Sequence, residues 1–63
     1  MTITITICTD NAAFEDDPES EVARILAAYA RQLADGLTNL SFARKLRDIN
    51  GNTVGSVEVK EDV

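Results

Sequence analysis

The sequence predicts a small α+β domain of order β-α-β-β, in which one helix covers one face of a three-stranded sheet. Three observations predict it. The chain opens with isoleucines and threonines in strict alternation, residues 18–35 repeat apolar side chains at helical spacing, and two later β-like runs flank the pair Asn50-Gly51. The 63 residues contain no internal repeat and no linker, so we predict one domain over residues 1–63.

Residues 2–8 have both the period and the β-branched composition of a strand. Ile3, Ile5 and Ile7 share one face, which we expect to be a core face. The other face carries Thr2, Thr4, Thr6 and Cys8. The loop TDNAAFEDD follows, and we expect its one large apolar side chain, Phe14, to pack on the first turn of the next helix.

A helix is predicted over residues 18–35. Asp17 is a good N-cap, Pro18 suits the first helical position, and two glutamates follow at the positive end of the helix dipole. One apolar stripe runs along it, made of Val22, Ile25, Leu26, Tyr29 and Leu33. We expect Gly36 to end the helix in the left-handed conformation.

The last two strands are predicted to form a hairpin around Asn50-Gly51, the preferred pair for a two-residue type I′ turn. With this turn, Ile49 pairs with Asn52. The register then places one set of pairs on the buried face, namely Phe42–Val59, Arg44–Val57, Leu46–Gly55 and Asp48–Thr53. The wet face pairs Ala43–Glu58, Lys45–Ser56 and Arg47–Val54. Arg44 must extend its stem outward to reach water.

The strand order follows from the connections and the charges. A right-handed crossover makes the first two strands parallel. The third strand is the more apolar of the hairpin, whereas the second carries Arg44, Lys45 and Arg47, which suits an edge. We therefore predict a three-stranded mixed sheet of order 1-3-2. An order with the second strand in the centre is the alternative.

This order makes the threonine-rich strand the other edge of the sheet. It has high β propensity and no lysine, proline or bulge to block pairing with another chain. A chain of this length buries only about 60% of its unfolded surface, and its single cysteine allows no internal disulfide. The threonine face is either simply solvated or, as we predict, part of a self-association surface made by Thr2, Thr4 and Thr6.

The chemistry-bearing residues form no catalytic constellation, so we expect no enzyme and no catalytic residues. The chain has no histidine, and Cys8 therefore has no obvious base. The run EDDPESE is explained by helix capping, and DINGN places its glycine fourth, where a calcium loop needs it sixth. We expect no metal and no cofactor.

The net charge of −5 is unevenly distributed. Residues 1–21 carry six acids and no base, whereas residues 22–47 carry five bases and one acid. This balance disfavours nonspecific binding to nucleic acid or to an anionic membrane. The sequence shows no membrane-spanning stretch and no signal peptide, and its lone cysteine suits a reducing compartment, so we expect a cytoplasmic protein.

The acidic residues near the helix start have two interpretations. They either serve only the cap and the dipole, or they also form a partner-binding patch that faces a basic protein surface. The patch consists of Asp10, Glu15, Asp16, Asp17, Glu19 and Glu21.

At TDNAAFEDD and LRDINGNTVGSVEV the chain resembles small uncharacterised open reading frames of tailed bacteriophages and their prophages. The two segments lie toward either end, so the likeness covers most of the chain. They specify a loop and a hairpin, with no active site to carry over. The resemblance implies a bacterial cytoplasm and an accessory protein that binds and redirects or inhibits a host protein.

Three functions compete on this basis. The first is an accessory protein that acts by protein–protein contact on a host protein or defence complex. The second is a homo-oligomer that holds a small molecule between its subunits without catalysis. The third, which we favour least, is an enzyme.

Overall fold

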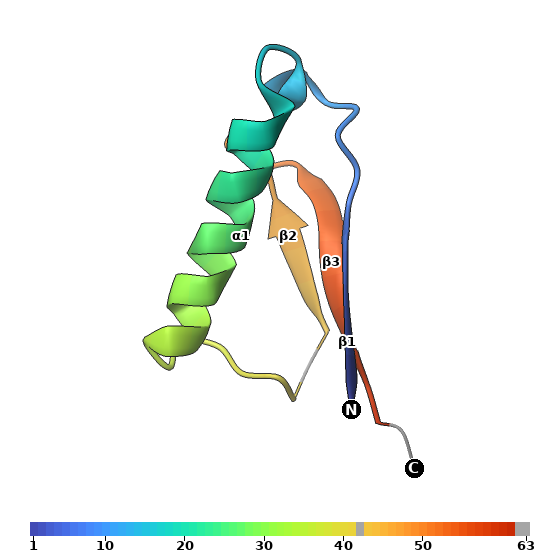
Figure 1. Ribbon diagram of the computed structural model, residues 1–63, viewed down its shortest axis with the longest axis vertical. Helices are drawn as coiled ribbons and strands as arrows, with labels where there is room; N and C mark the ends of the chain where they lie inside the picture. Colours follow the sequence, from blue (N-terminus) through green and yellow to red (C-terminus); the bar gives the residue numbers. More distant parts are fainter. Residues whose placement is uncertain (42, 62–63) are drawn as a thin grey trace.

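The computed structural model contains three strands, one helix and one short 3-10 turn, and it describes residues 1–41 and 43–61. In chain order the elements are β1 (Thr2–Ile7), η1 (Ala12–Phe14), α1 (Pro18–Ala34), β2 (Arg44–Arg47) and β3 (Thr53–Lys60). The sheet has the order β1-β3-β2, and α1 lies on one of its faces (Figure 1). The predicted α+β class and strand order are confirmed.

Both hydrogen-bonded strand pairs are antiparallel. β3 pairs with β1 on one side and with β2 on the other, so the two outer strands share one direction without touching. The sheet is therefore antiparallel rather than mixed, because the central position of β3 separates the two parallel strands. The predicted pair of Phe42 with Val59 lies outside the described residues.

Helix α1 begins and ends close to where its capping residues predict. The Ser20 backbone N–H donates to Asp17 Oδ1 at 3.1 Å, and the Ser20 hydroxyl donates to Asp17 Oδ2 at 2.7 Å. These hydrogen bonds satisfy the exposed start of the helix and hold the pKa of Asp17 below its ordinary value. Gly36 follows the last turn with a φ of 74°, as expected for a left-handed residue there.

The turn between β2 and β3 differs from the predicted type I′ turn. Gly51 has a φ of 86°, but no described residue other than glycine has a positive φ, whereas a type I′ turn also needs one at Asn50. The Asp48 N–H donates to the Asn52 carbonyl at 2.9 Å, and the Gly51 N–H donates to the Asp48 carbonyl at 3.0 Å. The loop thus has three residues, and the predicted pair Ile49–Asn52 is wrong.

The Asp48 side chain explains this choice of turn. Its Oδ1 accepts from the backbone N–H groups of both Asn50 and Asn52, each at 2.9 Å. An aspartate that satisfies its own following backbone favours this turn over the mirror-image one.

A β-bulge restores the predicted register beyond the turn. Arg47 lies opposite Thr53 and Leu46 opposite Gly55, so Val54 has no residue opposite it. The pairs Arg44–Val57, Lys45–Ser56 and Leu46–Gly55 are confirmed, whereas Arg47–Val54 and Asp48–Thr53 are wrong. Because the bulge changes the alternation of faces, Val54 is buried instead of lying on the wet face.

The core lies between α1 and the part of the sheet formed by β2 and β3. Its buried apolar members are Phe14, Ile25, Tyr29, Leu46, Val54 and Val57. Val57, at the centre of the middle strand, is fully buried. Phe14 is also buried, so the loop before the helix contributes to the core as predicted.

Candidate protein-contact surface

The isoleucines of β1 lie on the helix face of the sheet but are only half covered. Ile5 is opposite Val57 and Ile3 is opposite Val59, and directly opposed residues of antiparallel strands point to the same face. Since Val57 belongs to the core under α1, Ile3 and Ile5 point to that side as well. They nevertheless remain 43% and 44% exposed, so the expectation that they lie in the core is wrong.

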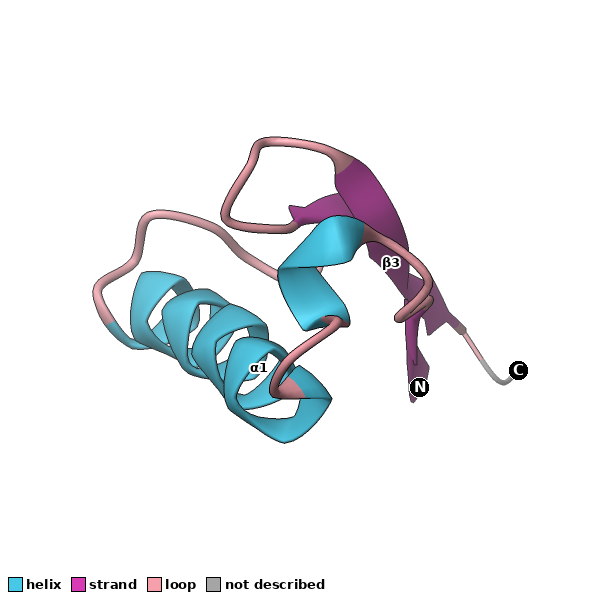
Figure 2. Ribbon diagram, turned by 90° about the horizontal axis from the view of Figure 1, so that it is seen from above, coloured by secondary structure: helices cyan, strands magenta, loops and turns pink. Residues whose placement is uncertain are grey.

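The position of α1 explains this exposure. The helix lies on the side of β2 and β3, and β1 is the strand farthest from it (Figure 1). Seen from above, the helix covers only part of the sheet (Figure 2). An α-helix is about 10 Å wide and neighbouring strands are about 4.8 Å apart, so one helix covers roughly two strands. On the helix itself, Ile25 is 3% exposed, whereas its neighbour Leu26 is 39% exposed. The predicted placement of Leu26 in the core is thus also wrong.

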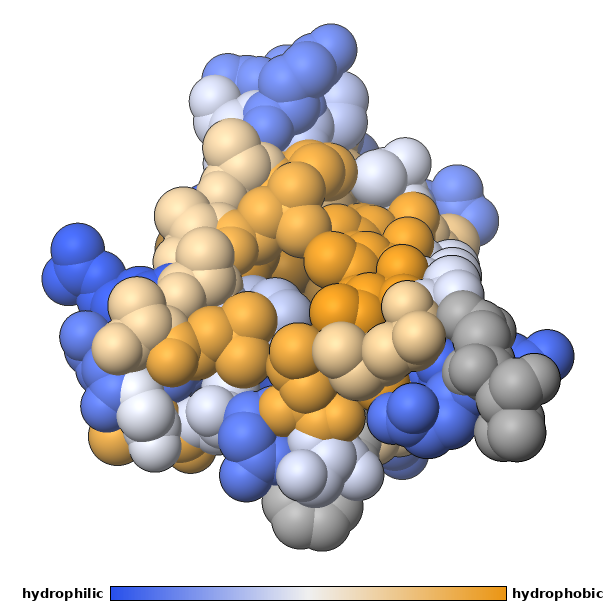
Figure 3. Space-filling view, turned by 60° about the horizontal axis from the view of Figure 1, so that its bottom comes forward, coloured by the Kyte–Doolittle hydropathy of each residue, from blue (hydrophilic) through white to orange (hydrophobic). Residues whose placement is uncertain are grey.

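Ile3, Ile5 and Leu26 form what we term the open apolar face. Ile7, Val22 and Leu33 are partly buried and pack against the core. A space-filling view shows apolar side chains gathered around a hollow on this side of the molecule (Figure 3). The surface is therefore an unfinished part of the hydrophobic core, open to solvent.

The threonines of β1 point to the opposite face of the sheet. Thr2, Thr4 and Thr6 are all exposed. Among the residues that the structure describes, β1 forms a strand ladder with β3 alone, so it is an edge strand. Two of the three residues of the open apolar face, Ile3 and Ile5, belong to this edge strand.

The predicted acidic patch lies elsewhere, in the segment between β1 and α1 and in the first turn of α1. Glu15, Asp16 and Glu19 are exposed, and Asp17 is engaged as the helix cap. Asp10 is exposed and its Oδ2 accepts from the Cys8 thiol at 3.1 Å. The structure therefore does not bring the acidic residues and the threonine face together into one site.

Glu21 does not belong to the exposed acidic patch. It is buried, and its carboxylate accepts from Arg24 at 2.7 and 3.0 Å and from the Ile49 backbone N–H at 2.8 Å. The hydrogen bonds from Arg24 are the main cause that lowers the pKa of Glu21. Its position four residues before Ile25 and eight before Tyr29 places it on the buried side of α1, and this helical spacing was the signal in the sequence that separates it from the acids around it.

Asp48 is the other buried carboxylate of the described chain. Burial alone would raise the pKa of Asp48, but hydrogen bonds from Asn52, Asn11 and Asn50 together hold the pKa below its ordinary value. These partners give Asp48 a structural role at the turn between β2 and β3.

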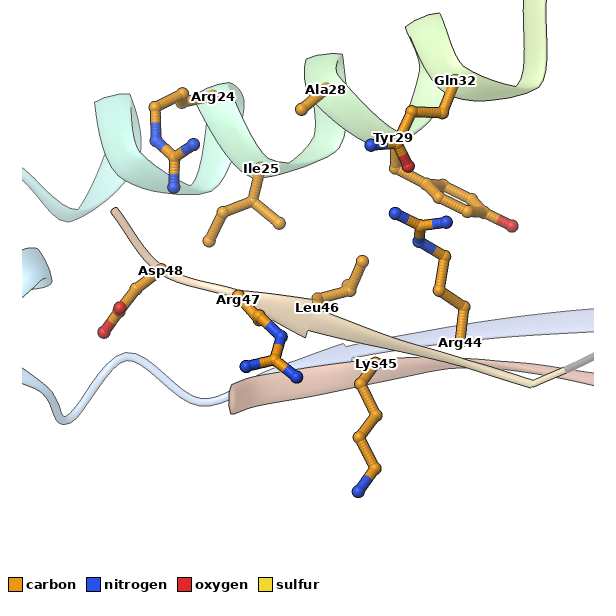
Figure 4. Close-up of a pocket in the computed structure, with 10 residues that line it drawn as sticks. All are labelled: Arg24, Ile25, Ala28, Tyr29, Gln32, Arg44, Lys45, Leu46, Arg47 and Asp48. Carbon is orange, nitrogen blue, oxygen red and sulfur yellow. The ribbon is translucent and has the colours of Figure 1, made fainter. Parts of the chain in front are cut away.

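A cavity of about 310 Å³ lies between α1 and the outer side of β2 (Figure 4). Arg24 and Arg44 extend into this space, whereas Lys45 points away from the helix. The Arg44 guanidinium lies 5.9 Å from the centre of the Tyr29 ring, and the buried Gln32 Oε1 accepts no hydrogen bond among the described residues. Arg24 is already paired with Glu21, and Arg47 donates to the Gly51 carbonyl at 3.2 Å, so Arg44 is the lining cation best placed to bind an anion here.

The described residues contain no group of three or more histidine, cysteine or carboxylate side chains placed to hold a metal ion. Within the same part of the chain, no helix is long and apolar enough to cross a membrane. Comparisons with protein-family models, with curated proteins and with solved structures found no match.

Proposed function

We propose that this chain is a small accessory protein that acts by protein–protein contact, without catalysis, and binds or inhibits a host protein. The observation that carries the proposal is the open apolar face. Ile3, Ile5 and Leu26 expose apolar surface on the side of the sheet that elsewhere forms the core. Exposed apolar side chains beside an unguarded strand edge are typical of protein contact sites.

Two features support a host protein as the target. The resemblance of TDNAAFEDD and LRDINGNTVGSVEV to reading frames of tailed bacteriophages favours a bacterial cytoplasm and a host partner. The exposed acids Glu15, Asp16 and Glu19 favour a partner with a basic surface, because complementary charge accelerates encounter.

A matched pair of variants tests the proposal. Ile5→Lys places a charge in the open apolar face, and Ile49→Lys makes the same change at the hairpin turn, where the side chain is also exposed. Each tagged protein is used to capture proteins from bacterial host lysate, after circular dichroism has verified its fold. We expect a host protein that wild type and Ile49→Lys retain and Ile5→Lys loses. Equal capture by Ile5→Lys, or no specific capture by wild type, would contradict the proposal.

The cavity between α1 and β2 favours small-molecule binding as a second candidate, at a site within one copy of the chain rather than between the subunits of a homo-oligomer. Its volume is near the lower limit of small-ligand pockets, and Arg44 provides a cation at its wall. Inorganic phosphate should then raise the melting temperature of wild type and of Arg31→Gln, which is changed at an exposed helix residue outside the cavity. Arg44→Gln should lose this stabilisation. An unchanged wild-type melting temperature would remove this candidate.

A further inference from the structure

We infer that the partner of the β1 edge is a second copy of this chain, and that two copies pair their β1 strands antiparallel across a twofold axis. The product is one sheet of six strands, three from each copy. The inference rests on the proposed function, because it concerns the same contact surface. A host protein that binds the open apolar face then competes with the second copy for Ile3 and Ile5. Four observations carry it: the edge, its lack of charge, the side to which its isoleucines point, and their exposure.

The two edges of the sheet differ in charge. β1 contains no ionisable side chain, so pairing it with its own copy brings no like charges together. β2 carries Arg44, Lys45 and Arg47, and pairing it with its own copy would oppose cations across the new ladder. Of the two edges, β1 is therefore the one suited to self-pairing.

Symmetry determines which side chains meet. Two identical strands that pair antiparallel are related by a twofold axis perpendicular to the sheet, and the contact uses the same patch on both copies. Opposed residues of antiparallel strands point to one face, so isoleucines oppose isoleucines and threonines oppose threonines. Both α1 helices then lie on the same face of the joined sheet.

This arrangement covers the surface that one copy leaves open. Ile3 and Ile5 of both copies come together at the centre of the joined sheet, between the two helices. Leu26 lies on the side of α1 opposite the cavity that Arg24, Ala28 and Gln32 line. In the dimer, the Leu26 side chain of each copy therefore borders the central group of isoleucines, one from each side. The half-exposed side chains of two monomers thus become one shared apolar cluster.

The acidic residues stay available in such a dimer. Glu15 and Asp16 lie between η1 and α1, away from the β1 edge (Figure 1). Self-pairing through β1 and contact of the acidic patch with a host protein are therefore compatible.

Sedimentation equilibrium of the full chain, from micromolar to millimolar concentration, tests the inference. We expect a dimer for wild type and the same dissociation constant for the control Ile49→Lys. Ile3→Lys should raise this constant at least about tenfold, because the dimer would bring two ammonium groups into an apolar centre. Circular dichroism verifies that each variant folds. A wild type that stays monomeric, or an Ile3→Lys variant as dimeric as wild type, would overturn the inference.

Cysteine cross-linking tests the strand pairing itself in a Cys8→Ser background. Two registers of the β1 pair keep isoleucine opposite isoleucine along most of the strand. In one, Thr4 lies on the twofold axis and faces Thr4 of the other copy; in the other, Ile5 lies on the axis and faces Ile5. The Cα atoms of a residue and its symmetry mate would then be about 4.5–5.5 Å apart, which a disulfide can span. We expect Thr4→Cys or Ile5→Cys to form a covalent dimer on mild oxidation.

The control is Glu58→Cys, which is exposed and lies opposite Thr4, but on the central strand β3. It should stay uncross-linked. A dimer that cross-links through Glu58→Cys and through neither β1 position would overturn edge pairing in favour of another interface.

The two proposals fail separately. A monomeric wild type that still captures a host protein through the open apolar face would overturn the dimer and leave the proposed function standing. A cross-linked dimer that captures no protein would uphold the dimer and contradict the proposed function.

Discussion

The carboxylate of Glu21, in the first turn of α1, accepts a hydrogen bond from the backbone N–H of Ile49, in the turn between β2 and β3, at 2.8 Å. The two residues are 28 positions apart in the sequence. The same carboxylate also accepts from Arg24, which keeps it oriented. This contact ties the start of the helix to the β2–β3 hairpin, and it helps to hold α1 on the side of the sheet away from β1.

The first prediction concerns the pH dependence of this contact. The folded state lowers the pKa of Glu21 below its ordinary value of 4.5, so its stabilisation is present above that pH and is lost as the pH falls through the lower folded value. Thermal melts from neutral to acidic pH should show wild type losing stability below about pH 5. Glu21→Gln should melt lower at neutral pH and show a smaller acid-induced loss. Identical pH profiles would rule out this role for the charge.

The second prediction compares two adjacent helix residues. Ile25→Ala should reduce the free energy of unfolding by about 2–5 kcal/mol, because Ile25 is buried in the core. Leu26→Ala should cost clearly less in the monomer, since more than a third of Leu26 is exposed. Urea denaturation at low protein concentration measures both. A Leu26→Ala variant as damaged as Ile25→Ala would mean that α1 packs differently on the sheet.

The third prediction concerns Gly55 in the central strand. A Cβ atom placed there would overlap the backbone carbonyl oxygen of Thr6 in β1, and backbone cannot move aside as a flexible side chain can. We expect Gly55→Ala to lower the free energy of unfolding by about 1–3 kcal/mol through this overpacking. The neighbouring change Ser56→Ala is the control and should cost much less. If both variants melt together, β1 and β3 do not approach each other as closely as described.

The fourth prediction separates the cap from the rest of the acidic patch. Asp17→Ala should lower the melting temperature, because it removes the carboxylate that accepts two hydrogen bonds from Ser20. Changing Glu15 to Gln and Asp16 to Asn together should leave it unchanged, since both side chains are exposed. With a captured host protein, the double variant should associate more slowly, and the difference should shrink at high salt. An association rate equal to that of wild type at low salt would restrict these acids to the helix.

Local signals in the sequence were sufficient for most of the fold. The alternation in residues 2–8, the Asp17 cap and Gly36 each specify their element through short-range chemistry, and the charges of β2 favour its edge position. The hairpin turn was mispredicted because the Asp48 side chain bonds to its own following backbone, which outweighs the Asn50-Gly51 preference. The bulge at Val54 compensates for the additional loop residue, so the register of Leu46 was still correct.

The contact surface was harder to predict because it depends on where the helix lies across the sheet. Periodicity shows that Ile3 and Ile5 share a face, but it does not show which strands α1 covers. The exposure of one edge strand could have been predicted from dimensions alone. One helix covers roughly two strands, so a three-stranded sheet under one helix must leave one edge open. The spacing of Glu21, Ile25 and Tyr29 places Glu21 on the buried side of α1, but it does not identify Ile49, 28 positions away, as the partner of Glu21.

Hydrogen exchange of the β1 backbone amides, measured at low and at high protein concentration, tests whether this edge pairs with a second copy. We expect the amides of residues 2–7 that point away from β3 to exchange quickly in dilute solution and slowly in concentrated solution. The amides of Arg44–Arg47 on the other edge, β2, should exchange at the same rate in both. Exchange of the β1 amides that does not depend on concentration would contradict the claim that this edge, with its open apolar face, is a protein-contact surface for a second copy.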